Sequence, residues 1–449
     1  MKIVVIGAGS IFFTRRMVTG AAQSPRLRSC EIVLVDIDPL KCEQMGLFCQ
    51  KIAEAHKAQI KVSWTTDRLE ALPGADYVVL SFAIRNYHYR ETGTNLAKTY
   101  GIHLISGETA GPSAVFRILR SVPPVLKVAA DIERLCPNAI VINYVNPTNV
   151  VGLALQRFTK VRAYAFCDGM YEENPKQIAR ILGQTNPKTW AELARDFKFT
   201  FGGINHFTFM WGLEQGGKSL HEALGAGLAR LAKEGGAGGE LQGEWDFFRV
   251  YDVWPTQFYH AIEYMRYYQG RGSRPGRDHF CNKWSLNDRI RWYRQVWKSI
   301  KDCNDGKITV QQAMTDHSSD MVAAIIDSIE GDTRAEFPVN VLNKGIIPNL
   351  PGDILVETLG TIGKSGVEVK SVGPLPAGLA GLIQPSIESQ ELALEASRTG
   401  NFRTVVRAVA ADPLVMSLND AEDLARDFMA QEEADLDAVH DPYWWTPRR

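Results

Sequence analysis

The sequence predicts an α/β protein that begins with a doubly wound parallel sheet of the Rossmann type. Over the first 165 residues, short runs rich in β-branched residues alternate with helical stretches, which is the pattern of βαβ units. The first run passes directly into a Gly-x-Gly turn at Gly7 and Gly9. After about residue 195 the alternation fades, and more helix and more aromatic residues follow. We therefore predict a Rossmann-like domain at residues 1–195 and an α+β domain at residues 196–449.

Hydrophobic patterning locates the individual elements. The clearest strands are residues 2–6, 31–35, 76–82 and 139–143. Apolar residues recur at helical spacing in residues 15–22, 40–57 and 114–135. Pro137 ends the last of these helices. In the tail, residues 389–398 and 419–430 predict amphipathic helices that close the core or an oligomer interface, and Gly-rich stretches at 235–239 and 269–277 predict loops.

Composition excludes several classes of function. The 449 residues carry 50 Lys and Arg against 51 Asp and Glu, a net charge of −1, so no basic stripe for nucleic acid or a membrane surface is expected. The longest mostly apolar run, residues 77–84 with Ser81 inside it, is far shorter than the roughly 20 residues that span a bilayer. Seven scattered cysteines without a Cys-x-x-Cys pair are typical of reduced thiols. With no secretory signal at the N-terminus, we expect a cytoplasmic protein.

The Gly-x-Gly turn predicts a dinucleotide site. Gly7 permits the tight turn, and Gly9 lets the backbone approach a pyrophosphate at the start of a helix that follows Ser10. The third position of the fingerprint is Phe12, so the motif is incomplete. Asp36 ends the second strand, where a carboxylate would bind the ribose hydroxyls and repel a 2′-phosphate. The pattern favours NAD, although Asp36 alone could equally be a turn or capping residue.

Four further motifs carry groups suited to chemistry. They are Gly-Glu-Thr-Ala-Gly-Pro at 107–112, Asn-Tyr-Val-Asn-Pro at 143–147, Phe-Cys-Asp-Gly-Met at 166–170 and Gly-Ile-Asn-His-Phe at 203–207. Cys167 and His206 offer a thiolate and an imidazole to a divalent transition metal, with Asp168 and Asn146 nearby in the chain. Taken singly, each has a structural alternative: a buried thiol, a hydrogen-bonded histidine, a capping carboxylate and a turn before proline.

Together these motifs resemble glycoside hydrolase family 4, the NAD- and divalent-metal-dependent glycosidases. The matching segments run from Gly7 to about Leu424 and include Val-Asn-Val at 339–341, Asn-Leu-Pro-Gly-Asp at 349–353 and Gln-Glu-Leu at 390–392. The resemblance implies a fold related to lactate and malate dehydrogenases. It also implies a homodimer or homotetramer, with the first domain binding NAD and the second binding substrate.

The resemblance implies an unusual route to hydrolysis. In such enzymes NAD takes a hydride from C3 of the sugar, a base removes the acidified C2 proton, and the aglycone is eliminated from C1. Water then adds, and the hydride returns to C3. On the family pattern Cys167 and His206 bind the metal, which we expect to be manganese, while Asn146 and Glu108 contact the sugar.

Asp168 is the residue that indicates the anomeric configuration of the substrate. Within the family, members acting on 6-phospho-α-glucosides have Asp after the metal-binding Cys, as Asp168 follows Cys167 here. This subgroup resemblance implies that Asp168 is the general acid and that the substrate is an α-linked, gluco-type glycoside. The chain departs from the subgroup because Gly169 precedes Met170 and the usual Pro is absent.

Two features of the substrate chemistry stay open. The C2 base of the family lies after a Pro in the second domain, which favours Tyr259 here, although the register could place Phe258 there and His260 is the reserve. The Asp-Glu-x-Ile-Pro stretch of phospho-sugar members is missing, so the C6 substituent could be a hydroxyl, carboxylate, sulfonate or phosphate. Arginines that could pair with an acid there are Arg85, Arg90, Arg271, Arg274 and Arg277.

Two other functions compete with glycoside hydrolysis. A plain NAD-dependent dehydrogenase of a sugar or hydroxy acid would need no metal and would release NADH. A catalytically silent NAD-binding sensor is favoured if the segment around Tyr259 lacks a base.

Overall fold

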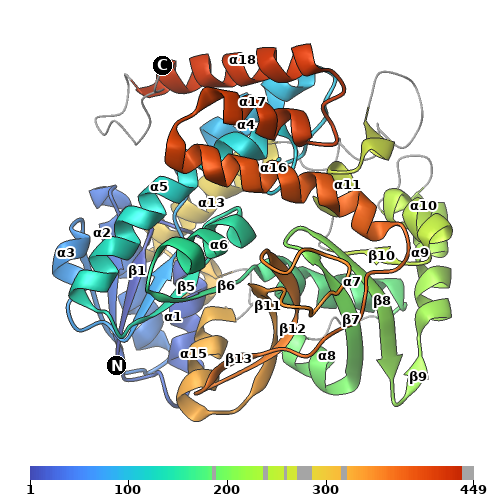
Figure 1. Ribbon diagram of the computed structural model, residues 1–449. Helices are drawn as coiled ribbons and strands as arrows, with labels where there is room; N and C mark the ends of the chain where they lie inside the picture. The colour runs from blue at the N-terminus through green and yellow to red at the C-terminus, as the bar shows by residue number, and fades with distance from the viewer. Residues whose placement is uncertain (185–188, 236–240, 257–259, 270–285, 315–320, 437–449) are drawn as a thin grey trace.

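A single mixed sheet runs through the molecule, with helices on both of its faces (Figure 1). The computed structural model describes residues 1–184, 189–235, 241–256, 260–269, 286–314 and 321–436. Strands follow one another across the sheet in the order β10-β8-β7-β12-β11-β6-β5-β4-β1-β2-β3. The α/β class predicted from the sequence is therefore confirmed.

The N-terminal half of the sheet is parallel. Its strands are β1 (Lys2–Ile6), β2 (Glu31–Val35), β3 (Lys61–Thr65), β4 (Tyr77–Leu80), β5 (Ile140–Asn143) and β6 (Arg162–Ala165). The order β3-β2-β1-β4-β5-β6 reverses direction between β1 and β4. This is the doubly wound Rossmann order, and ligands bind such sheets at the reversal, beyond the carboxyl ends of the strands.

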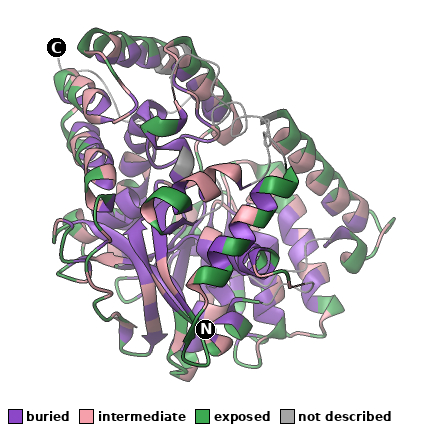
Figure 2. Ribbon diagram, turned by 90° about the vertical axis from the view of Figure 1, so that its right-hand side faces the viewer, coloured by how far each residue is buried: buried purple, intermediate pink, exposed green. Residues whose placement is uncertain are grey.

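Alternate residues of β1, β2 and β4 enter two separate cores. Ile3, Ile32 and Tyr77 face the core covered by α1 (Thr14–Gln23), α2 (Pro39–Ala55), α13 (Leu286–Asn304) and α15 (Met321–Gly331). The next residue of each strand faces the core covered by α5 (Pro112–Leu135), α6 (Thr148–Phe158), α16 (Leu379–Thr399), α17 (Phe402–Ala411) and α18 (Leu418–Leu436). Burial on both faces explains why these strands read as continuous hydrophobic runs. Figure 2 shows the buried strands inside and the exposed residues on the outer helices.

The rest of the sheet is antiparallel. The longer strands are β7 (Phe197–Ile204), β8 (Phe207–Gln215), β11 (Ala335–Leu342) and β12 (Leu355–Gly363). Strand β11 pairs with β6 at Asn340 and Ala165, so the sheet continues without a break from one half to the other. The short strands are β9 (Lys218–Ser219), β10 (Trp254–Pro255) and β13 (Gly366–Glu368). A continuous sheet does not mark a domain boundary, so the division into domains at residue 195 stays a prediction.

The remaining helices join or cover these strands. They are α3 (Arg68–Ala71), α4 (Asn86–Thr99), the π-helix η1 (Gly169–Glu173), α7 (Asn174–Ile181), α8 (Trp190–Asp196), α9 (His221–Gly235), α10 (Gln242–Tyr251), α11 (His260–Glu263), the 3₁₀ helix η2 (Arg266–Tyr268) and α14 (Val310–Ala313). The helices predicted at 15–22, 114–135, 389–398 and 419–430 lie within α1, α5, α16 and α18, and the helix predicted at 40–57 runs two residues past the end of α2. The predicted loops at 235–239 and 269–277 lie almost wholly outside the described residues. Among the helices described, none has the length and hydropathy needed to cross a membrane.

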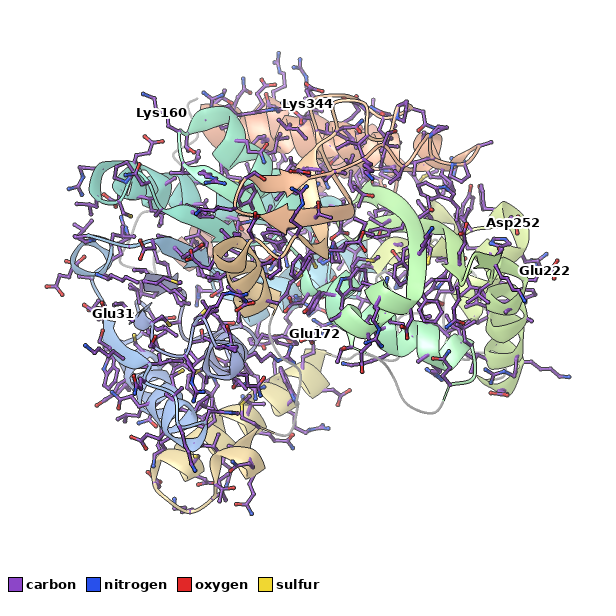
Figure 3. All side chains as sticks on the ribbon, turned by 90° about the horizontal axis from the view of Figure 1, so that it is seen from below. Glu31, Lys160, Glu172, Glu222, Asp252 and Lys344 are labelled. Atoms are coloured by element: carbon purple, nitrogen blue, oxygen red, sulfur yellow. The ribbon has the colours of Figure 1, made fainter. Side chains whose placement is uncertain are left out.

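A buried ion pair joins α1 to η1, the segment that follows β6. In Figure 3 Glu172 of η1 lies near the middle of the view, whereas Glu222 and Glu31 lie toward its sides. Glu172 Oε2 accepts a hydrogen bond from Arg16 Nη1 of α1 at 2.7 Å. This contact fixes the helix after the glycine turn against the segment that follows Cys167.

Candidate active site

The sequence motifs converge at the carboxyl edge of the parallel strands. Gly7 follows β1, Asp36 follows β2, Asn146 follows β5 and Cys167 follows β6. Carboxyl ends of parallel strands lie at one edge of a sheet, so segments far apart in the chain meet there.

The glycine turn and Asp36 form one unit. Gly7 has a φ of +92°, and a Cβ there would lie 2.6 Å from the backbone nitrogen of Phe82. The backbone N–H of Gly9 donates to Asp36 Oδ2 at 2.7 Å. Ser10 Oγ accepts from the N–H of Phe13, at the start of α1. The turn thus forms a cradle that a larger side chain would fill, and the carboxylate at its rim is placed to bind ribose hydroxyls. These features fit a dinucleotide.

Cys167 and His206 come together although 39 residues separate them. The Cys167 Sγ lies 3.1 Å from the His206 Nε2, and both residues are buried. A thiolate sulfur and an imidazole nitrogen this close could both bind one divalent transition metal. On the other side of the ring, Nδ1 lies 2.9 Å from Thr109 Oγ1. That contact orients the imidazole, as the outer partners of metal-binding histidines do.

The backbone at His206 holds a conformation that favours glycine. Strands β7 and β8 pair up to Ile204 and Phe207, which leaves Asn205 and His206 as a two-residue turn. His206 has a φ of +64°, and a positive φ at the second turn residue normally selects Gly or Asn. A strained residue kept at such a position indicates that its side chain is needed there.

Burial sets the protonation of the pair. It raises the pKa of the Cys167 thiol to about 12, with the charge of Glu357 adding to the effect. Burial also lowers the pKa of His206 well below its ordinary value, and the nearby His260 and Arg117 lower it further. Without a metal, a thiol therefore faces a neutral imidazole. A bound cation would have to displace the thiol proton, which makes its binding depend on pH.

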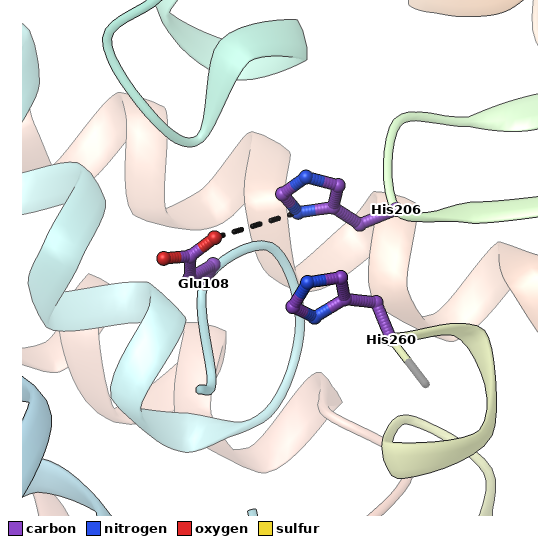
Figure 4. A group of neighbouring side chains, drawn as sticks. All are labelled: Glu108, His206 and His260. Atoms are coloured by element: carbon purple, nitrogen blue, oxygen red, sulfur yellow. Dashed lines mark ion pairs between the residues drawn. The ribbon is translucent and has the colours of Figure 1, made fainter. Parts of the chain in front are cut away.

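Glu108 and Asn146 lie beside this pair. Asn146 Nδ2 is 3.5 Å from Glu108 Oε2, which is 3.9 Å from His206 Nδ1 (Figure 4). Glu108 also forms a buried ion pair with Arg90, and Arg117 Nη1 lies 3.7 Å from its Oε1. The sequence predicted contacts from Glu108 and Asn146 to the sugar but did not anticipate the two arginines that hold Glu108.

A second set of potential ligands overlaps the first. Glu108, His206 and His260 each offer one ligand atom, and these atoms lie within 4.8 Å of one another. Thr109 occupies His206 Nδ1, however, and two guanidinium groups face Glu108. Cations already near the carboxylate would repel a divalent ion. The Cys167–His206 pair stays the predicted metal site.

Asp168 follows Cys167 directly and precedes the π-helix η1. Its carboxylate oxygens are buried. π-helical turns are rare and occur most often at functional sites. The position is compatible with the acid role predicted for Asp168.

The predicted base and several arginines are not in the described part of the chain. Tyr259 and Phe258 fall outside it, as do Arg271, Arg274 and Arg277. Arg85 precedes α4. His260 is described, and its ring stacks on that of His206 with centroids 4.4 Å apart.

Glu263 is the buried residue of this region that sequence reasoning missed. It is fully buried and hydrogen-bonded to His260. Hydrogen bonds from His260 and from the backbone and side chain of Ser106 outweigh its burial and lower its pKa to about 2. The His-x-x-Glu spacing at 260–263 was the available signal, because residues three apart share one helix face.

Comparison with known proteins gives a consistent picture. Residues 2–184 match the family model described as "Family 4 glycosyl hydrolase", and residues 201–415 match its C-terminal domain. A "Probable 6-phospho-beta-glucosidase" of Bacillus subtilis (strain 168) is 27% identical, covering 97% of both chains. An alpha-galactosidase of the same strain is 26% identical, covering 92% of this chain and 93% of that protein.

Solved structures share the fold. The 6-phospho-beta glucosidase of Thermotoga maritima, solved with manganese, NAD+ and glucose-6-phosphate, has a TM-score of 0.78 at 20% identity, covering 97% of this chain and 99% of that one. The malate dehydrogenase of Cryptosporidium parvum has a TM-score of 0.51 at 13% identity, covering 89% and 99%. The predicted relation to the dehydrogenase fold is confirmed.

Proposed function

Because the chain belongs to family 4 of the glycosyl hydrolases, we propose that it cleaves an α-linked, gluco-type glycoside through NAD-dependent, metal-assisted elimination. The observation that carries the proposal is the 3.1 Å approach of Cys167 Sγ to His206 Nε2. A soft thiolate and an imidazole suit a divalent transition metal. The pair belongs to the same sheet edge as the glycine turn, so a metal and a nicotinamide could act on one sugar.

Two groups supplied from solution complete the site. NAD, held by Gly7, Gly9, Ser10 and Asp36, would supply the acceptor for the hydride at C3 and return it after cleavage. Manganese, held by Cys167 and His206, would supply a Lewis acid for the oxygens at C2 and C3.

The protein's own side chains bind and orient the sugar. Asn146 and Glu108 lie against His206 and offer an amide and a carboxylate to the sugar hydroxyls. Arg90 and Arg117 form ion pairs with Glu108, which favour its ionised form. An ionised carboxylate accepts hydrogen bonds and donates none. Asp168 would hold the proton that the leaving oxygen receives, so it has to be protonated when substrate binds.

The arginines favour an acidic group on the sugar. Arg90 is buried, and its Nε and Nη1 atoms have no hydrogen-bond partner among the described residues. Burial, then the nearby charge of Arg289, lowers the pKa of Arg90 well below its ordinary value. A carboxylate or phosphate at C6 would accept hydrogen bonds from these N–H groups. A neutral sugar would leave them without an acceptor, which costs free energy in a buried site.

A panel of nitrophenyl α-glycosides tests the proposal. Sugars with a C6 hydroxyl, carboxylate or phosphate are incubated with enzyme, NAD, manganese and a reductant. The proposal predicts aglycone release without net NADH, and loss of release when manganese is omitted. Net NADH without manganese supports a dehydrogenase, and no reaction with any sugar supports a sensor. β-Glycosides serve as the matched control for the anomer.

The proposal also includes the cellular setting. The described cysteines are all free and buried, which suits the reducing cytoplasm. The dimer or tetramer implied by the family is part of the proposal and is tested by light scattering.

A further inference from the structure

We propose that His260 removes the proton from C2 of the sugar, and that Glu263 positions it. The inference rests on the proposed elimination and adds the base that it requires. A tyrosine was the prediction from the sequence, and Tyr259 lies outside the described residues. The geometry around His260 points instead to an imidazole held by a buried carboxylate.

Glu263 is a fixed acceptor. Its Oε2 accepts hydrogen bonds from the backbone N–H groups of Ile105, Ser106 and Gly107 at 2.7, 2.9 and 3.3 Å. Its Oε1 accepts from Ser106 Oγ at 2.7 Å and lies 2.9 Å from His260 Nδ1. The side chain has no exposed surface. Each of these N–H and O–H groups can donate to an ionised carboxylate, so the Glu263 side chain is held at both of its oxygens.

This arrangement selects one form of the imidazole. Because the carboxylate only accepts, the hydrogen of neutral His260 lies on Nδ1, and Nε2 keeps its lone pair. Ser106 Oγ, 3.0 Å from Nδ1, helps to fix the ring. A base oriented by a third, buried group is the general design of activated proton acceptors in enzymes.

His260 is also at the right place. Its ring lies parallel to that of His206, with centroids 4.4 Å apart and an interplanar angle of 17°. Figure 4 shows the two rings side by side, one from the β7–β8 turn and the other from α11. The His260 side chain keeps 19% of its surface exposed, against 5% for His206. A sugar held beside Cys167 and His206 would therefore lie next to His260, the more accessible of the two imidazoles.

Another described candidate fits less well. The Tyr264 hydroxyl accepts from the N–H of Thr109 at 3.2 Å and is buried. Burial and the charge of Glu263 raise its pKa well above the ordinary value, so a phenolate there is costly.

The proton that leaves C2 of the sugar passes to His260. With C3 already oxidised by NAD+, the C2–H bond breaks and the proton passes to His260 Nε2. The electron pair forms the C1–C2 double bond while the C1–O bond breaks, and the leaving oxygen takes a proton from Asp168. Water later adds at C1, and C2 takes a proton back.

The His260→Gln variant separates this step from the others. Under single turnover it should form NADH and ketosugar in equal amounts, because C3 oxidation needs no C2 base. Exchange of the C2 hydrogen with D₂O should fall by about 10²–10⁴-fold, the range of general base catalysis. Manganese affinity by electron paramagnetic resonance, and NAD affinity by fluorescence, should stay within about twofold of wild type. Added imidazole should restore exchange to His260→Ala.

Comparison with other variants makes the test decisive. Exchange retained in His260→Gln but lost in Tyr259→Phe or Tyr264→Phe would overturn the inference and leave elimination standing. Absence of C2 exchange in the wild type would instead refute the proposed function itself.

The role of Glu263 is tested by a double-mutant cycle. Glu263→Gln should lower kcat with little change in KM, and Glu263→Asp should recover part of it. In the His260→Ala background, Glu263→Gln should cost little further exchange, because the residues act as one unit. An equal loss in both backgrounds would assign Glu263 only to holding the 105–107 loop.

Discussion

Two substitutions at His206 measure the backbone cost of its positive φ separately from its role as a metal ligand. A left-handed φ of +64° costs a side chain with a Cβ roughly 1–2 kcal/mol. Glycine does not carry that cost, but it raises the conformational entropy of the unfolded chain, which lowers the free energy of unfolding by roughly 0.4–1 kcal/mol. His206→Gly should therefore be more stable than His206→Ala by about 1 kcal/mol, or about 1–2 °C in Tm for a chain of this length. Both variants lose the same contacts to Cys167 and Thr109, so their difference isolates the backbone.

Thermal unfolding of the two metal-free variants measures that difference. Manganese binding should be lost in both, which shows that the strain is kept for the imidazole and not for the turn. If His206→Ala equalled or exceeded His206→Gly in stability, the left-handed assignment would be wrong. If either variant kept wild-type manganese affinity, His206 would not be a ligand.

Other predictions concern the metal, the acid range and the buried ion pair. Cys167→Ser should lower manganese affinity by at least about 100-fold and leave NAD affinity unchanged, since the glycine turn lies on another loop; equal loss of both would contradict the ligand role. Burial raises the pKa of Asp412 to about 6, opposed by N–H groups of Leu414 and Gly111. The Asp412 carboxyl of the unfolded chain therefore ionises more readily, and from pH 7 to pH 5 the wild type should gain about 1 kcal/mol of stability relative to Asp412→Asn in urea titrations. Glu172→Ala removes the buried carboxylate that pairs with Arg16 and should cost about 3–5 kcal/mol in the same assay; a loss under about 1 kcal/mol would show that the pair is solvated.

The sequence predicted the parallel half of the sheet because its signals are local. Strands β1, β2 and β5 read as short apolar runs, since both of their faces are buried. Strand β3 escaped notice because only one of its five residues is buried, so its pattern is mostly polar. The antiparallel strands β11 and β12 insert between β6 and β7, a long-range pairing that no local pattern specifies.

The sequence predicted those site residues that lie in recognisable local motifs. Cys167 and His206 were paired through the family pattern, and the structure brings them within 3.1 Å. The contacts of Glu263 with residues 105–107 span more than 150 positions. They depend on the folded arrangement, and the His-x-x-Glu spacing at 260–263 indicates at most a shared helix face, not these contacts.

The sugar released by wild-type enzyme in D₂O tests the central claim most directly. Nuclear magnetic resonance of the product should show deuterium at C2 and the original hydrogen at C3, because the first is lost to solvent and the second is stored and returned. A product that keeps its hydrogen at C2 would contradict cleavage by elimination.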